Sequence, residues 1–173
     1  SILDLNDDIS VINKNLKQKW RNSLNLFQKQ NVVIREENSE ESLKKVLKYF
    51  EKIQKQKNFK GINIKLLEHF LKNSKNIIYF AYLNSEFIGY MCVSLDANSS
   101  TYLLGYASET GRNINVMNGL MWHAMNDLKN KNFSYFDLGG LDDLNTPGIF
   151  KFKSGVNAKK YELIGDYKTT NLL

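Results

Sequence analysis

Apolar residues in the first half of the chain recur every three or four positions, which is the spacing of one face of a helix. The pattern predicts three helices, over residues 10–30, 43–53 and 66–71. The first of them has a single apolar stripe of Ile12, Leu16, Trp20, Leu24 and Phe27. Extended segments are predicted at residues 1–5 and 31–36, so two helices in succession follow one strand.

The second half of the chain alternates strands with one long helix. Residues 76–83 and 86–95 flank the turn pair Asn84-Ser85 and predict an antiparallel hairpin, which residues 100–108 extend. The remaining elements are a loop over residues 109–113, a helix over 114–128, a strand over 133–138, a loop over 139–148, a short helix and a last strand over 160–167.

This order of elements predicts a layered α/β domain with a mixed, mostly antiparallel sheet flanked by helices. An antiparallel meander that continues through a helix into a further strand places that strand parallel to the one before the helix. Two parallel neighbours whose ends separate leave a cleft between them. We therefore expect a cleft beside the strand at residues 133–138.

Composition narrows the class of protein. A chain of 173 residues with 42% hydrophobic content predicts one packed domain. Cys92 is the only cysteine, which excludes an internal disulfide and favours a reducing compartment. The longest apolar runs are far shorter than a membrane span and the N-terminus lacks the order of a signal peptide, so we expect a cytoplasmic protein without stable membrane insertion.

The formal net charge of +6 bears on the choice of partner. It is compatible with an anionic partner such as RNA, a nucleotide or a phosphorylated lipid precursor. Lysines on helix exteriors are also common simply as solvated faces. The charge alone leaves both interpretations open.

The segment from Phe136 to Gly155 concentrates residues that control the backbone. It holds the only proline and four of the ten glycines, together with two adjacent carboxylates and two lysines one residue apart. Gly139 and Gly140 predict a turn away from a buried strand end, and Pro147 fits the first turn of a short helix capped by Thr146 or Asn145. The segment is therefore predicted to form a rigid corner beside the cleft.

Three groups of residues follow one another along the chain: Lys19, Arg21 and Asn22, then Asp137, Gly139 and Gly140, then Gly148, Ile149, Phe152 and Lys153. These groups resemble motifs of the FemAB-type family of GNAT-related acyltransferases. The strand order is also similar to that of the GNAT fold, where a cleft between the fourth and fifth strands holds the acyl donor. The resemblance spans essentially the whole chain and corresponds to the second of two GNAT-like halves. Residues 1–30 would form a strand and basic helix that pack on a single domain of residues 31–173.

The resemblance implies an N-acyltransferase. Members of the family add amino acids from aminoacyl-tRNA to peptidoglycan precursors. The expected reaction is direct transfer of an acyl or aminoacyl group to an amine of a cell-envelope or polysaccharide precursor, through a tetrahedral intermediate. The expected donor is an aminoacyl-tRNA or an acyl-CoA, with no tightly bound cofactor. The acceptor would be a small-molecule, lipid-linked or nucleotide-linked amine, and tRNA is a candidate partner.

Two alternatives stay open beside this reading. One is an acetyl-CoA-dependent GNAT N-acetyltransferase that acts on an amino sugar. The other is a non-catalytic half domain that binds a substrate or a partner, because the companion half is not part of this sequence.

Three residues are candidates for catalysis. Lys153 is the first, because an ammonium group near the donor stabilises the negative charge that develops during acyl transfer. Asp137 either accepts backbone amides from the glycine turn or acts as a base. Tyr106 is a candidate proton donor to the leaving group, together with Tyr102 on the same strand.

The candidates for substrate binding contribute charge or space. They are Lys19 and Arg21 for a nucleotide or tRNA phosphate, Arg112 for a phosphate, Asp142 for a cationic amine, Tyr102 at the cleft border, and Gly139 and Gly140 for room beside the donor. His69 and His123 are the only histidines and have no partners at ligand spacing, so no metal site is expected.

Overall fold

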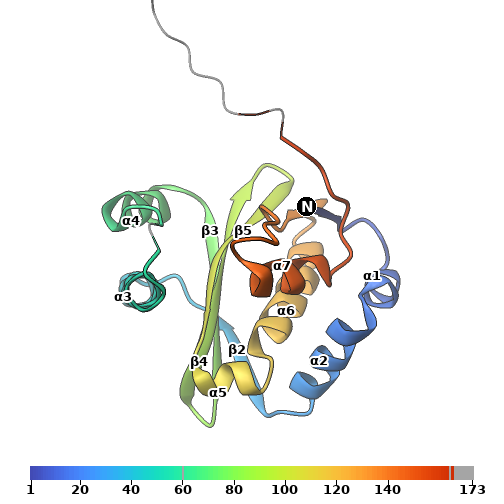
Figure 1. The fold of residues 1–173 in the computed structure, drawn as a ribbon, viewed down its shortest axis with the longest axis horizontal. Coiled ribbons are helices and arrows are strands. Elements are labelled where there is room, and N and C mark those ends of the chain that lie inside the picture. The colour runs from blue at the N-terminus through green and yellow to red at the C-terminus, as the bar shows by residue number, and fades with distance from the viewer. Residues whose placement is uncertain (60, 164, 166–173) are drawn as a thin grey trace, which may run out of the picture.

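A computed structural model describes residues 1–59, 61–163 and 165 of the chain. Helices alternate with strands along it (Figure 1). The strands are β1 (Ile2–Asp4), β2 (Val32–Glu36), β3 (Asn76–Leu83), β4 (Glu86–Asp96), β5 (Ser99–Ala107) and β6 (Tyr135–Asp137). The helices are α1 (Ile9–Asn15), α2 (Gln18–Gln28), α3 (Glu40–Lys57), α4 (Ile64–Asn73), α5 (Glu109–Asn113), α6 (Val116–Asn130) and α7 (Pro147–Ser154).

The strands form one six-stranded sheet in the order β1-β6-β5-β4-β3-β2. Neighbouring strands are antiparallel except β5 and β6, which pair in parallel. The connection between β5 and β6 runs through α5 and α6. The mixed, mostly antiparallel sheet is therefore confirmed, and so is the parallel strand after the long helix.

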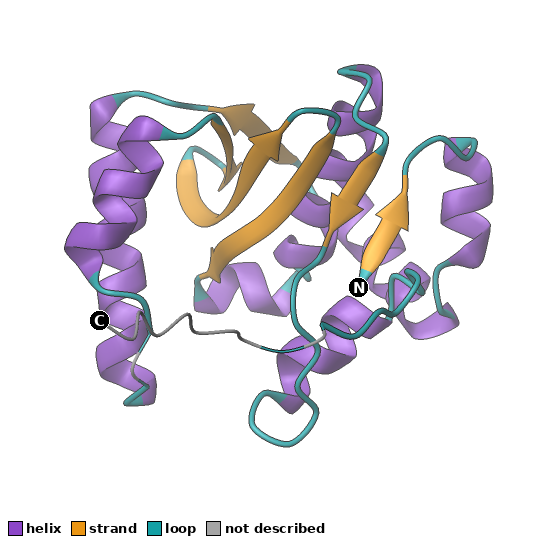
Figure 2. Cartoon of the chain, turned by 90° about the horizontal axis from the view of Figure 1, so that it is seen from above, coloured by secondary structure: helices purple, strands orange, loops and turns teal. Residues whose placement is uncertain are grey.

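Helices cover both faces of the sheet (Figures 1 and 2). Helices α3 and α4 lie on one face, and α1, α2, α6 and α7 lie on the other. The side chains of β3 point alternately to the two faces of the sheet. Ile77, Tyr79 and Ala81 belong to the core shared with α2 and α6. Ile78 and Phe80 belong to the core beneath α3 and α4. Both faces of the central strands are apolar because both are buried.

The helix predicted over residues 10–30 is in fact two helices, α1 and α2, with a corner at Leu16 and Lys17. Both corner residues have extended backbone, with ψ values of 140° and 145°. Leu16 is buried in the core, and the amide of Lys17 donates a hydrogen bond to the carbonyl oxygen of Gly155 at 2.9 Å. Both helices bury residues of the same apolar stripe, so the apolar spacing continues through the corner. The corner itself depends on the hydrogen bond between Lys17 and Gly155, which are 138 residues apart.

Two other predicted boundaries differ from the structure. The loop predicted over residues 109–113 is the short helix α5, because the Ser108 hydroxyl accepts a hydrogen bond from the amide of Gly111 and caps it. The last strand predicted over residues 160–167 is not formed at residues 160–163 and 165, and residues 164, 166 and 167 lie outside the described part. Only Lys159 bridges to Ile2, since β1 offers just three residues before the chain leaves the sheet.

Residues 1–30 share their core with the rest of the chain. Leu3, Ile12, Leu24 and Phe27 pack in one cluster with residues of β3, β4 and α6. The contact between α2 and α6 is very close, because a Cβ added at Gly119 would lie 2.1 Å from the Phe27 ring. In the part of the chain described here, none of the helices combines the length and apolar character needed to cross a membrane.

Candidate functional site

Strands β5 and β6 part after a short parallel pairing. Their register runs from Ser99 opposite Tyr135 to Thr101 opposite Asp137. Strand β5 then continues to Ala107, whereas the segment that follows β6 turns away from it at Gly139. We call the space between Tyr102 of β5 and residues 138–140 the β5–β6 fork.

Gly139 makes the turn at the fork. Its φ is +76°, a conformation that side-chain-bearing residues rarely adopt, and its amide donates to Oδ1 of Asp137 at 2.8 Å. A Cβ at Gly139 would lie 3.4 Å from Nζ of Lys153, and one at Gly140 would meet no atom within 4 Å. The glycines therefore leave space directly beside the Lys153 ammonium group.

Lys153 fills the fork from the side of α7. The residue is only 8% exposed, and no other Lys, Arg, His, Asp or Glu in the described part of the chain is buried. Its Nζ donates a hydrogen bond to the carbonyl oxygen of Gly140 at 3.2 Å and lies 5.2 Å from the centre of the Tyr102 ring. Burial lowers the pKa of Lys153, and the charge of Asp137 opposes that shift.

Trp20 of α2 holds α7 in position, a role that the sequence did not reveal. Its indole nitrogen Nε1 donates to the carbonyl oxygen of Phe152 at 3.1 Å, and its ring stacks on the Phe152 ring at a centroid distance of 6.3 Å. Gly155 permits this approach, since a Cβ there would lie 2.5 Å from Cδ1 of Trp20. Trp20, which belongs to the apolar stripe of α2, thus fixes the position of Phe152, the neighbour of Lys153 in the sequence.

Asp137 accepts a backbone amide of the glycine turn through Oδ1, which is one of the two roles that the sequence leaves open. Its second oxygen, Oδ2, accepts a hydrogen bond from the Tyr161 hydroxyl at 2.5 Å. This bond raises the pKa of Tyr161. The sequence predicts a strand over residues 160–167 and does not point to Tyr161, because nothing in it marks a contact with Asp137.

Tyr102 and Tyr106, predicted to border one cleft, lie on opposite faces of the sheet. The pairing of β4 with β5 shifts register at Val93, which faces Tyr102 while its neighbour Cys92 faces Leu104. The bulged residue between them reverses the alternation of side chains. Tyr102 therefore reaches Lys153, whereas Tyr106 packs on the α3 side against the rings of Tyr49, Phe87 and Tyr90. The structure does not bring Tyr106 to the fork.

The predicted phosphate-binding cations lie outside the fork. Arg21 is half-buried and donates to the carbonyl oxygen of Lys14 and to Gln18, so it supports the corner between α1 and α2. Lys19 is exposed on α2. Arg112 is exposed on α5 and donates to the carbonyl oxygen of Ala107 at 2.9 Å.

Asp142 caps its own exposed loop. Its carboxylate accepts from the amides of Leu144 and Asn145, and these bonds lower its pKa, with Asn145 contributing most. The loop then enters α7 with Thr146 as the cap residue and Pro147 in the first turn. Among the described residues, no three His, Cys, Asp or Glu side chains lie together in a way that could hold a metal ion.

The chain is similar to several known proteins. A family model described as an acetyltransferase (GNAT) domain matches residues 14–154. No match was found among curated protein sequences. The crystal structure of FemX superposes with a TM-score of 0.77 at 11% identity, covering 90% of this chain and 57% of FemX. The chain thus spans little more than half the length of FemX.

Two other solved structures share the fold. An aminoglycoside acetyltransferase from an uncultured soil metagenomic sample, solved in complex with sisomicin, gives a TM-score of 0.57 at 15% identity, covering 81% of this chain and 97% of its own. L-PGS from Bacillus licheniformis gives 0.58 at 17% identity, covering 84% of this chain and 46% of its own.

The likeness to FemX and L-PGS agrees with the FemAB-type resemblance and, at these identities, establishes the fold. The family model covers most of the chain, including the parallel strands β5 and β6 and the buried Lys153. The chain belongs to the acetyltransferase (GNAT) domain family.

Proposed function

We propose that the chain is an N-acyltransferase that transfers an acyl or aminoacyl group directly to an amine at the β5–β6 fork. The observation that carries the proposal is the burial of Lys153 beside two glycines. A buried ammonium group is costly to a fold, so its retention in an open-sided turn is best explained by a ligand that uses it.

Lys153 supplies hydrogen-bond donors where negative charge develops. An ammonium group has three N–H donors, and the described residues accept one of them through the carbonyl oxygen of Gly140. The remaining donors are free to meet the oxyanion of a tetrahedral intermediate or the departing oxygen or sulfur. Tyr102 positions the ammonium group by lying under it, and Gly139 and Gly140 leave room for the donor carbonyl.

The reaction balances without a further reagent. The neutral amine nitrogen attacks the carbonyl carbon, the bond from that carbon to the ester oxygen or thioester sulfur breaks, and the proton that the nitrogen loses ends on the departing oxygen or sulfur, directly or through solvent. Asp137 orders the turn through Gly139, and we assign it a positioning role. Lys19, Arg21 and Arg112 remain predicted phosphate contacts at the periphery.

The edge of β5 offers a track for an extended donor. From Tyr102 to Ala107 this strand has no partner on the side of β6 among the described residues. Exposed strand edges bind extended chains through backbone hydrogen bonds. Both an acyl-CoA, which carries amide groups, and the end of an aminoacyl-tRNA could bind along this edge.

We infer a cell-envelope or polysaccharide amine as the acceptor and the cytoplasm as the site of reaction. The alternative of an acetyl-CoA-dependent N-acetyltransferase acting on an amino sugar is favoured by the likeness to the aminoglycoside acetyltransferase. A third possibility is a half domain that binds without catalysing.

Donor binding separates these functions. Acetyl-CoA should raise the melting temperature if an acyl-CoA is the donor, whereas a charged tRNA should bind in its place if the donor is an aminoacyl-tRNA. Product formation is then measured by mass spectrometry with an amine-bearing peptidoglycan precursor and with an amino sugar. Failure of both donors to bind would contradict the enzymatic proposal and favour the non-catalytic half domain.

A further inference from the structure

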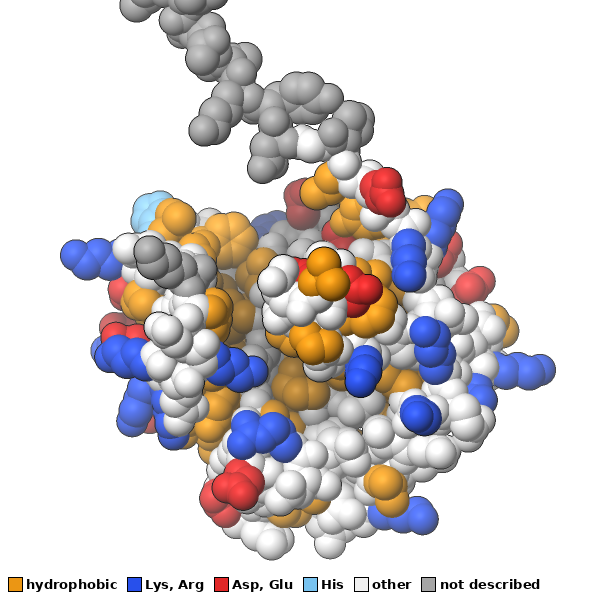
Figure 3. Space-filling model, viewed as in Figure 1, with side chains coloured by type: hydrophobic (Ala, Val, Ile, Leu, Met, Phe, Trp, Pro, Cys, Tyr) orange, Lys and Arg blue, Asp and Glu red, His pale blue; other side chains and the backbone are white. Residues whose placement is uncertain are grey.

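The positive charge of the chain is concentrated in one layer of the fold. Residues 40–75, which comprise α3, α4 and their connection, contain ten lysines and four glutamates, and their net charge of +6 equals that of the whole chain. Figure 3 shows many basic side chains projecting from this layer, at the left of the view. The rest of the chain has no net charge, so the excess positive charge is not spread evenly over the sequence.

The same layer exposes an apolar stripe. Leu66 and Phe70 lie one turn apart along one side of α4, with exposed fractions of 57% and 38%, and Ile62, which is 43% exposed, precedes the helix. Leu67 and Leu71 on the neighbouring side are buried in the core beneath α3 and α4. Helix α4 therefore has two apolar sides, and the protein covers only one of them.

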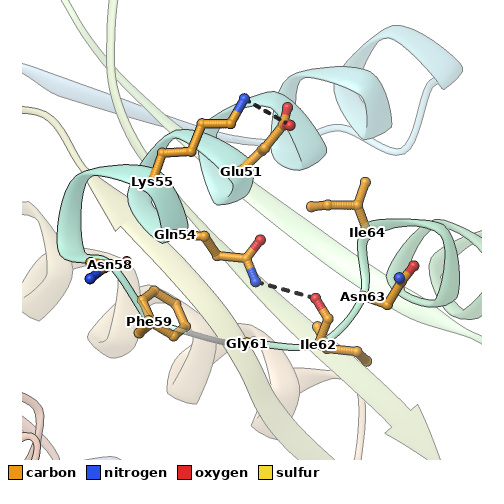
Figure 4. A pocket seen from close by; sticks show the side chains of 9 residues that line it. All are labelled: Glu51, Gln54, Lys55, Asn58, Phe59, Gly61, Ile62, Asn63 and Ile64. Atoms are coloured by element: carbon orange, nitrogen blue, oxygen red, sulfur yellow. Dashed lines mark hydrogen bonds and ion pairs between the residues drawn. The ribbon is translucent and has the colours of Figure 1, made fainter.

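Phe59 extends this stripe into the connection between α3 and α4. Phe59 and Ile62 line one hollow of about 570 Å³, together with Lys55 and Gln54 (Figure 4). Nε2 of Gln54 in α3 donates a hydrogen bond to the carbonyl oxygen of Ile62 at 3.3 Å. We call Phe59, Ile62, Leu66 and Phe70 the α4 stripe.

Lysines lie close to the α4 stripe along the chain, and two of them, Lys57 and Lys65, keep their charge available. Lys55 lines the same hollow and pairs with Glu51, whereas Lys57 and Lys65 make no ion pair with any described residue. Lys65 directly precedes Leu66, and Lys57 ends α3 close to Phe59 in sequence. Apolar and cationic groups thus meet on one surface.

We propose that the α3–α4 layer docks on an anionic lipid surface. The α4 stripe would enter the boundary between headgroups and acyl chains, and the lysines would contact lipid phosphates. A second copy of the chain is disfavoured, because two layers of charge +6 would face each other. A nucleic acid could contact the lysines through its phosphates, but it would not remove the apolar side chains of Ile62 and Leu66 from water into an apolar environment. The proposal does not depend on Lys153 or on the reaction at the fork.

Vesicle flotation tests the proposal with the whole chain. The protein should float with vesicles of phosphatidylglycerol and phosphatidylcholine, remain unbound with phosphatidylcholine alone, and dissociate as salt increases. The double variant Leu66→Ser, Phe70→Ser should weaken binding by about tenfold or more, since both side chains would lose apolar contact. The double variant Lys57→Glu, Lys65→Glu should weaken it similarly, at about tenfold or more.

Val33→Ser is the matched control, because Val33 is an exposed apolar residue of β2 and belongs neither to α3 nor to α4. It should bind like the unaltered protein, and circular dichroism should show that all variants are folded. The proposal is wrong if anionic vesicles are not bound, or if the stripe variant binds as tightly as the Val33→Ser control. It is also wrong if the layer binds tRNA through Lys57 and Lys65 while vesicles float without protein.

Discussion

Lys153 places a positive charge where burial opposes it. Its lowered pKa means that folding favours the neutral amine, so the unfolded chain binds more protons than the folded chain between the two pKa values of this group. The free energy of unfolding should therefore gain a rising contribution from Lys153 as the pH passes through its folded pKa toward the ordinary lysine value of about 10.5.

The variant Lys153→Met isolates this contribution. Urea unfolding between neutral and alkaline pH should show a smaller rise with pH in Lys153→Met than in the unaltered protein, since every other titrating group is shared. At neutral pH, the variant should be at least as stable, because a buried ammonium group has been replaced by an apolar side chain of similar length. A variant that is less stable at neutral pH and follows the same pH slope would contradict the assigned burial of Lys153.

Adding a methyl group at Gly139 and at Gly140 should change the free energy of unfolding by different amounts. Gly139→Ala forces a side chain into a φ of +76° and toward Nζ of Lys153, so the free energy of unfolding should fall by about 1–2 kcal/mol. Gly140→Ala meets no atom within 4 Å and should have little effect on stability. Urea denaturation compares the two, and equal losses would show that the turn does not depend on the conformation of Gly139.

Side-chain direction was the weakest part of the residue-scale prediction. Lys153, Asp137 and Gly139 could be assigned to one corner from sequence because they flank a strand end and a short helix. Tyr106 could not be excluded from it, since the bulge between Tyr102 and Leu104 is a property of the pairing with β4. A strand read alone shows alternation, but it does not show where a partner shifts the register.

At the scale of elements, α2 and α7 act as a unit. The hydrogen bond from the Trp20 indole to the carbonyl oxygen of Phe152 and the bond from the Lys17 amide to the carbonyl oxygen of Gly155 tie the start of α2 to the end of α7. Periodicity predicted the apolar stripe of α2 and a short helix after Pro147. It did not predict the corner at Leu16, because that corner depends on a hydrogen bond to α7 rather than on local preference.

Trp20→Phe should weaken this contact. The variant keeps an aromatic ring and loses the indole donor to Phe152, so the free energy of unfolding should fall by about 1–2 kcal/mol. Transfer activity should also fall, because α7 carries Lys153. Trp122→Phe on α6 is the control, since the indole of Trp122 makes no hydrogen bond to any described residue. A Trp20→Phe protein as stable as Trp122→Phe would show that the indole hydrogen bond to Phe152 does not stabilise the contact between α2 and α7.

At the scale of the whole molecule, the two faces of the sheet differ in character. One face carries α7 and the β5–β6 fork, and the other carries the lysine-rich α3–α4 layer. The layered fold and the parallel strand pair follow from the order of elements, which explains why the sheet type was predictable. The excess of lysines in residues 40–75 can be read from the sequence. Only the structure shows that α3 and α4 form one layer (Figure 1), so that these lysines belong to one surface.

The proposed acyl transfer at the β5–β6 fork requires Lys153. The rate of product formation by Lys153→Met and by Lys151→Met tests this requirement, measured by mass spectrometry with the donor that binds. Lys151 is exposed on the same helix, so its variant controls for charge and for the α7 backbone. We predict that Lys153→Met stays folded and loses activity by more than about tenfold, while Lys151→Met keeps it. Equal activity in the two variants would contradict the assignment.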